Sequence, residues 1–400
     1  MFVILNDQKR QWLGNYMALR AVLLISLIVC SFMRVADAGT RPSVAFLSPD
    51  DSRFWQMVAG FMEQVAVDLD VDLEVQFDTD RHRFSYLRMA QQIVTAEEKP
   101  DYLIIMCKEL VTTQILEQAH GQGVKVFSFN TDVPEATRAA VGMPRETLDS
   151  WIGHVVPDNV EAGRTLARLL ERRAVERGLV EAGEPVPMVA LTGTQDSSAA
   201  RDRNQGLLNA TSIGNGQLLQ LVLAEWSEQQ ASEKMSVLFR RYPQTTAIWN
   251  ASDGMALGAI EAARNAGRTP GEDVIVGGVD WEPRALAAIH RGDLMVSLGR
   301  HFMGGGLVLL LIHDYHHGYD FAEGRRSAAL RYQFEPATAD NVHLVERMLA
   351  PENWKALDFR QFSRALNPQL REQDFSAEQL MDQFSSGLIQ LGGGNQLVRQ

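Results

Sequence analysis

Short apolar runs alternate with amphipathic stretches along most of the chain after Arg41. In the first half the apolar runs predict strands at 44–47, 73–77, 102–106 and 124–129. The stretches between them space their apolar residues as a helix does, and they predict helices at 54–69, 86–96 and 111–119. Strands that alternate with helices are typical of βαβ units and predict a parallel sheet.

The pattern pauses around 131–157 and then starts again. The second half predicts strands at 189–191, 218–223, 246–249 and 274–279, with helices at 201–211, 231–241 and 255–266. Two similar α/β halves predict two lobes with a cleft between them. From about Asn341 the pattern is not repeated, and Ser376 and Gln379 form a capping-box motif that opens another amphipathic stretch.

The N-terminus has the pattern of an export signal. Lys9, Arg10 and Arg20 precede an apolar run at 21–33, and Ala36-Asp37-Ala38 follows it. This arrangement predicts a signal peptide over 1–38, a mature chain that begins at Gly39, and a periplasmic location. The alternative is an uncleaved membrane anchor, although the run is shorter than the roughly 17–25 residues that a spanning helix needs.

Charge and motifs exclude several classes of function. The net charge of −12 argues against a nucleic-acid partner, because such proteins present a basic surface. The chain has no Gly-x-Ser-x-Gly elbow, no phosphate-binding loop ending in Gly-Lys-Ser/Thr and no His-Glu-x-x-His motif, so we predict neither an enzyme nor a cofactor. His313, His316 and His317 could ligate a metal, but cationic groups at a helix C-terminus are commoner, and we predict no metal site.

Polar and aromatic side chains follow nearly every predicted strand. In open parallel sheets, ligands bind beyond the carboxyl ends of the strands. The candidate ligand-binding residues at these ends are Ser52, Phe54, Trp55, Asn130, Arg201, Trp226, Ser252, Asp253, Asp280 and Arg300. Aromatic faces stack on the C–H faces of sugars, and the polar groups hydrogen-bond hydroxyls. Singly, Ser52, Asn130 and Asp253 could be helix caps and Trp226 could pack between lobes; together they predict a sugar-like, polyhydroxy ligand.

The same residues resemble the type I periplasmic binding proteins, which include the ribose-binding protein and the autoinducer-2 receptor. The resemblance covers about 41–340 and rests on the phrases at 52–55, 100–105, 129–130, 200–203, 253–259 and 278–280. It implies an α/β fold of two doubly wound parallel-sheet lobes joined by a hinge, with a C-terminal helical extension. The implied lobes are 39–150 plus 300–330 and 151–299 plus 331–345, followed by the extension at 346–400. The pair Arg201 and Arg300 looks most like the receptor type.

The resemblance implies two functions for a protein that closes around its ligand. The first is delivery of a sugar to the membrane permease of an ABC importer. The alternative is a periplasmic receptor that signals to a membrane sensor kinase or cyclase. Two further features each have two possible interpretations. The C-terminal extension is either a strap that packs on the lobes or a docking element. The run Gly304-Gly305-Gly306 either gives hinge freedom or allows close helix packing.

Overall fold

The computed structural model describes residues 41–324, 328–371 and 376–394. The predicted signal peptide at 1–38 lies outside these residues. The described chain contains two six-stranded sheets, with strand orders β11-β5-β4-β3-β1-β2 and β12-β10-β9-β8-β6-β7. The two orders are equivalent strand for strand, so the two predicted halves have the same strand order. In this doubly wound topology the strand order reverses beside the first strand of each half, where ligands bind.

The first sheet is entirely parallel. Its strands are β1 (Ser43–Ser48), β2 (Asp72–Phe77), β3 (Tyr102–Ile105), β4 (Lys125–Phe129), β5 (Trp151–Pro157) and β11 (Ala329–Tyr332). Its helices are α2 (Arg53–Asp68), α3 (Arg83–Thr95), α4 (Thr112–Gln122), α5 (Glu135–Val141) and α11 (Gly304–His316). Val44 and Phe46 of β1 pack in one core cluster with α2, and Ala45 and Leu47 pack in another with α3 and α4. Burial on both faces explains the uninterrupted apolar runs.

The second sheet has the same plan, except that its last strand is antiparallel. Its strands are β6 (Val186–Thr192), β7 (Gly216–Leu223), β8 (Ala247–Asn250), β9 (Ile275–Val279), β10 (Val296–Gly299) and the antiparallel β12 (Glu335–Ala337). Its helices are α6 (Asn159–Glu176), α7 (Ser198–Ile213), α8 (Glu228–Arg241), α9 (Asp253–Asn265) and α10 (Pro283–Arg291). The fold class is therefore the one that was predicted: α/β, with two doubly wound lobes.

The chain passes between the sheets in three places. It crosses at Asp158 between β5 and α6, at the short helix η1 (His301–Met303) after β10, and between β11 and β12. The boundary predicted at residue 150 therefore lies one strand too early, because β5 pairs with β4 in the first sheet. The boundary predicted at 330 divides β11, which pairs with β5.

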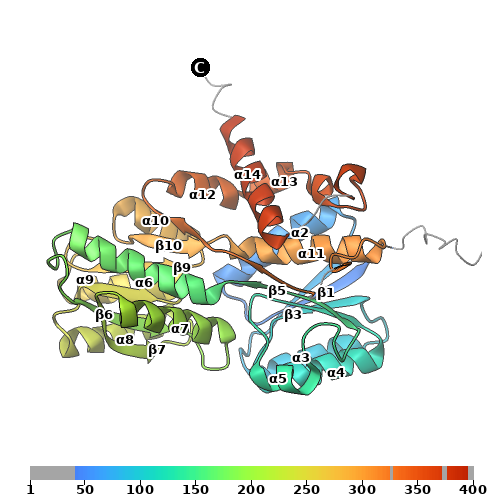
Figure 1. Cartoon of the computed structure of the whole chain (residues 1–400), viewed down its shortest axis with the longest axis horizontal. Coiled ribbons are helices and arrows are strands. Elements are labelled where there is room, and N and C mark those ends of the chain that lie inside the picture. Colours follow the sequence, from blue (N-terminus) through green and yellow to red (C-terminus); the bar gives the residue numbers. More distant parts are fainter. Residues whose placement is uncertain (1–40, 325–327, 372–375, 395–400) are drawn as a thin grey trace, which may run out of the picture. The chain divides into compact units, whose positions relative to one another are not determined.

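The C-terminal extension is helical, as predicted. It contains α12 (Val342–Leu349), α13 (Pro351–Ala356), the short helices η2 (Phe359–Phe362) and η3 (Pro368–Leu370), and α14 (Ala377–Gly394) (Figure 1). Ser376 Oγ accepts a hydrogen bond from the Gln379 backbone N–H at 3.1 Å, which is one half of the predicted capping box. Phe384 of α14 packs edge-on against Phe359 and Phe362, and its ring also lies 6.2 Å from that of Phe61 in α2. These contacts support the strap reading.

The glycine run at the start of α11 serves close packing. A Cβ atom on Gly305 would lie 2.5 Å from Met62 Sδ, and one on Gly306 would lie 2.5 Å from Phe61 Cε1. Any residue larger than glycine at these two positions would therefore push α11 away from α2. In the parts of the chain that the structure describes, no helix is both long and apolar enough to span a membrane.

Candidate ligand-binding cleft

A cavity of about 420 Å³ lies between the carboxyl ends of the two sheets. Its size suits a small organic ligand, for which pockets of roughly 300–1,000 Å³ are usual. Both lobes and one crossing segment contribute to its lining. Seven of the ten predicted ligand-binding residues line it: Ser52, Phe54, Trp55, Asn130, Trp226, Ser252 and Asp280.

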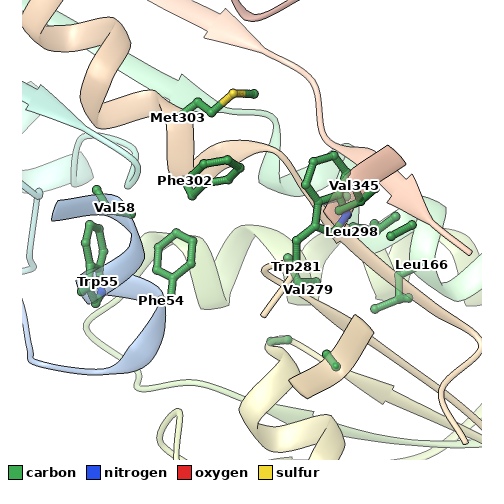
Figure 2. Close-up of a cluster of buried hydrophobic side chains, with 14 of the residues drawn as sticks. Phe54, Trp55, Val58, Leu166, Val279, Trp281, Leu298, Phe302, Met303 and Val345 are labelled. Carbon is green, nitrogen blue, oxygen red and sulfur yellow. The ribbon is translucent and has the colours of Figure 1, made fainter. Parts of the chain in front are cut away.

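Two aromatic side chains of the first lobe form one wall. Phe54 and Trp55 project from the first turn of α2 (Figure 2), with ring centroids 5.1 Å apart and nearly perpendicular ring planes. The Phe54 ring also stacks on the His301 ring at 4.5 Å. Ser52 precedes this helix, but its side chain makes no capping hydrogen bond. The wall therefore offers aromatic faces beside a hydroxyl group that the helix does not use.

Several strand-end residues have a backbone conformation that L residues rarely adopt. The φ angle is 68° at Asn130, 60° at Trp226, 132° at Asp280 and 84° at Arg300. Strained conformations of this kind cluster at ligand sites, because the surrounding structure holds side chains in directions that regular backbone does not allow. Asn130 follows β4 and lies well before α5, so it is not the N-cap of that helix. Among the described residues, no group donates a hydrogen bond to the buried Oδ1 atom of Asn130.

Trp226 lies against the backbone of the second lobe. A Cβ atom on Gly193 would meet the indole at 1.9 Å, so this position after β6 must be glycine for the ring to reach the cavity. The indole N–H donates a hydrogen bond to Thr194 Oγ1 at 3.3 Å. The Arg203 guanidinium lies 5.9 Å from the centroid of the same ring. Trp226 thus supplies an aromatic face opposite the wall formed by the first lobe.

Arg203 is the buried cation of the cavity. Only 3% of its surface is exposed. Its Nε donates a hydrogen bond to Asn159 Oδ1 at 2.9 Å and its Nη1 donates to the Ala251 carbonyl at 2.6 Å. Nη1 also lies 3.9 Å from Asp280 Oδ1. Burial raises the pKa of Asp280 to about 7, and the nearby Arg203 opposes this rise.

His301 completes the cavity where the chain crosses between lobes. Its Nε2 lies 3.3 Å from Asp280 Oδ1. Burial, together with the positive charge of Arg203, holds the pKa of His301 well below its usual value. The ring is therefore neutral at physiological pH, and its Nδ1 has no hydrogen-bond partner among the described residues.

Three predicted residues lie outside the cavity. Arg201 is half-exposed, and its Nη1 donates a hydrogen bond to Glu109 Oε1 at 2.6 Å across the rim of the two lobes. Asp253 is fully buried beneath the site, where Oδ2 accepts hydrogen bonds from the Glu282 N–H and from Ser297 Oγ. Arg300 points towards the C-terminal extension. The expected arginine pair is therefore corrected, because these two guanidinium groups do not meet in one pocket.

Arg203, His301, Glu282 and Lys108 line the cavity but were not predicted to bind ligand. The sequence could have indicated that Arg203 is buried. It precedes the buried residues Leu207 and Ala210 by four and seven positions and so shares their helix face. Arg201 is out of phase with this face. The sequence held no comparable signal for His301, whose direction depends on the left-handed backbone at Arg300.

The histidine cluster of α11 lies outside the cavity. The rings of His313 and His317 have centroids 4.4 Å apart, and His316 Nδ1 lies 3.1 Å from the Tyr102 hydroxyl. Within the described ranges, no group of three or more His, Cys, Asp or Glu side chains is arranged to hold a metal ion.

Comparison with known proteins gives consistent matches. The sequence model of the family described as the periplasmic binding protein domain matches residues 44–300 of this chain. A periplasmic sugar-binding protein from Pseudomonas fluorescens has a solved structure with a TM-score of 0.72 and 32% identity, and the match covers 83% of this chain and all of that one. The D-apiose import binding protein of Actinobacillus succinogenes is 26% identical over 66% of this chain and 76% of its own length. The ribose import binding protein of Escherichia coli is 27% identical over 48% of this chain, and only 64% of its own length is spanned.

Proposed function

Because the chain belongs to the periplasmic binding protein family, we propose that it binds a small sugar in the periplasm and delivers it to the membrane permease of an ABC importer. The observation that carries this proposal is the cavity between the lobes, which combines aromatic faces with buried hydrogen-bonding groups. Such a combination suits sugars, whose C–H faces stack on rings while their hydroxyls need polar partners. We propose a binding role without catalysis.

Contacts at the rim support closure around the ligand. Arg201 of the second lobe pairs with Glu109 of the first, and the Glu109 backbone N–H donates a hydrogen bond to the Asp196 carbonyl at 3.3 Å. Arg83 Nε lies 3.7 Å from Asp196 Oδ2 across the same rim. A ligand that touches both lobes stabilises the state in which these contacts form. The permease would then distinguish the closed protein from the open one.

The proposed ligand contacts divide between the lobes. Phe54, Trp55 and Trp226 would stack on the sugar ring. Ser52 and Asn130 from the first lobe, and Arg203, Ser252 and Asp280 from the second, would hydrogen-bond its hydroxyls. Ser252 also accepts a hydrogen bond from the Met255 N–H, so it caps α9 and retains its own hydroxyl proton for a ligand. Import is favoured over a sensor role by the import binding proteins among the relatives.

Calorimetric titration of the ligand-free protein with a panel of pentoses and hexoses tests the binding proposal. We expect at least one sugar to bind and to be recovered chemically unchanged, and failure of every sugar would contradict it. Uptake of the bound sugar by cells with and without the gene tests delivery. Normal uptake in the deletion strain would favour the receptor function instead.

N-terminal sequencing of the exported protein tests the proposed location. We expect the mature chain to begin at Gly39 and to be recovered from the periplasm. An intact Met1 in the membrane fraction would contradict the proposed signal peptide and favour an uncleaved anchor.

A further inference from the structure

We infer that the preferred ligand of this cleft is a polyhydroxy compound that carries a cationic amino group, and that the carboxylate of Glu282 receives this group. The inference rests on the proposed function, since it specifies the class of sugar that the cleft selects. It depends on three features of Glu282: its burial, its lack of a hydrogen-bond donor, and the charges around it.

Glu282 lines the cavity with only 8% of its surface exposed. It occupies the N-cap position of α10, yet its side chain makes no capping hydrogen bond. Its backbone N–H donates to Asp253 Oδ2 at 2.9 Å. Throughout the described ranges, no group donates a hydrogen bond to the Glu282 carboxylate. Because the carboxylate opens onto the cavity and takes no donor from the described chain, it can accept a hydrogen bond from a partner that comes from outside the chain.

Carboxyl groups outnumber cations around Glu282. Asp253 and Asp280 lie close to it, burial raises the pKa of both carboxyls, and Arg203 is the buried cation beside them. The Arg203 hydrogen bonds go to neutral acceptors, on Asn159 and Ala251, and none goes to Glu282.

The remaining charges near Glu282 neutralise its carboxylate only in part. His301 is neutral, as shown above. Arg284 is engaged on the surface by both carboxylate oxygens of Glu228, each at 2.7 Å, and Arg53 is exposed. On the opposite wall, Lys108 Nζ lies over the Tyr86 ring at 4.4 Å. Arg53 and Arg284 offset part of the charge of Glu282, but among the described residues neither donates a hydrogen bond to its carboxylate. An ammonium group on the ligand would therefore meet a carboxylate that still lacks a donor.

Protonation offers the free protein a second way to neutralise this carboxylate. Burial, reinforced by the charge of Asp280, raises the pKa of Glu282 to about 7. Without a ligand, the Glu282 carboxyl therefore keeps its proton in mildly acidic conditions. It releases this proton when an ammonium group binds. Affinity for an aminated sugar should consequently rise between pH 5.5 and pH 7.5, because less work is needed to remove that proton.

The experiment compares three amino sugars with their neutral parents by calorimetric titration. D-Glucosamine, D-galactosamine and 6-amino-6-deoxy-D-glucose are titrated beside D-glucose and D-galactose at pH 5.5 and pH 7.5. We expect at least one amino sugar to bind about tenfold or more tightly than its parent, with the preference larger at pH 7.5. In Glu282→Gln the preference should disappear, whereas Glu261→Gln, which alters an exposed carboxylate of α9, should retain it.

Each other outcome overturns a defined statement. If a neutral sugar binds as tightly as its aminated analogue, or if Glu282→Gln keeps the preference, the inference is wrong while the proposed sugar binding stands. If none of these amino sugars binds and every pentose and hexose of the neutral panel also fails, both the inference and the proposed function fail. We expect Glu282→Gln to fold, because a carboxamide has nearly the shape of the carboxylate that it replaces. Thermal denaturation checks this.

Discussion

Arg300 and Glu378 form an ion pair that joins a segment crossing between the lobes to the C-terminal helix α14. The second carboxylate oxygen of Glu378 accepts a hydrogen bond from the Gln333 N–H at 2.7 Å. Gln333 lies between β11 and β12, so one side chain of the extension holds two of the three crossing segments. Arg300 also donates hydrogen bonds to Glu335 and Asp382, each at 2.7 Å. The extension therefore braces the region about which the lobes would turn.

We expect Arg300→Ala to destabilise the protein rather than to remove a ligand contact. Arg300 is 1% exposed, so its loss leaves several hydrogen-bonding partners without a donor. Its carboxylate partners are partly exposed and can be rehydrated, so the free energy of unfolding should fall by about 1–3 kcal/mol. Urea denaturation measures this change. Arg201→Ala, which removes a half-exposed side chain, should shift the free energy by about 0.5 kcal/mol or less. Equal stability of the two variants would contradict the bracing role.

Arg203 and Arg201 form a matched pair for ligand binding. Arg203→Gln should weaken binding of the best sugar by about tenfold or more, because a buried charged donor in the cavity is lost. Arg201→Gln should change the affinity by about threefold or less, since Arg201 only bridges the rim. Calorimetric titration measures both, and thermal denaturation shows whether Arg203→Gln remains folded. A larger loss in Arg201→Gln would mean that the rim ion pair controls closure.

Most of the fold could be predicted because buried strands and amphipathic helices leave direct patterns. Strand β5 was not predicted, because Gly153 and His154 interrupt its apolar run. All seven of its residues are nevertheless buried. His154 is accommodated because its Nδ1 lies 2.9 Å from Ser128 Oγ. Helix α6 was also missed, although its buried residues Leu166, Leu170 and Ala174 recur every four positions.

The candidate site could be predicted only as far as strand ends locate side chains. The aromatic residues Phe54, Trp55 and Trp226 do line the cavity, because each follows a strand of its lobe closely. The direction of Arg300 could not be predicted. It depends on a left-handed backbone at that residue and on carboxylates that come from α14, far along the chain. Trp281 is likewise buried in the core among Val279, Leu298 and Val345 (Figure 2), and its indole N–H donates to the Ser297 carbonyl.

Phe384 tests the role of the extension as a strap. Its side chain is fully buried among rings of α2 and η2. Phe384→Ala should lower the free energy of unfolding by about 3–5 kcal/mol, because it removes buried apolar surface and leaves a cavity. Urea denaturation measures the loss, and the exposed neighbour Gln383 provides the control variant Gln383→Ala. A dedicated docking element would behave differently: Phe384→Ala would then leave stability nearly unchanged while sugar uptake fell.

The stability of the ligand-free protein should depend on pH through Glu282. The pKa of this carboxyl is raised from 4.5 to about 7 by burial. Between these two values the native state keeps the proton that the unfolded chain releases, so the contribution of Glu282 to stability is fully present below pH 4.5. It declines as the pH rises and is lost above about pH 7.

We therefore expect Glu282→Gln and the wild type to be similarly stable at pH 5, where the wild-type carboxyl is neutral. At pH 8 the variant should be more stable by about 1–3 kcal/mol, because the wild type then buries a charge without a donor. Urea denaturation across this pH range measures the difference between the two proteins, which cancels the titration of all other carboxyls. Glu261→Gln should follow the wild type throughout. Parallel curves for Glu282→Gln and the wild type would mean that the Glu282 carboxylate is neutralised within the free protein, and no ligand cation would then be needed.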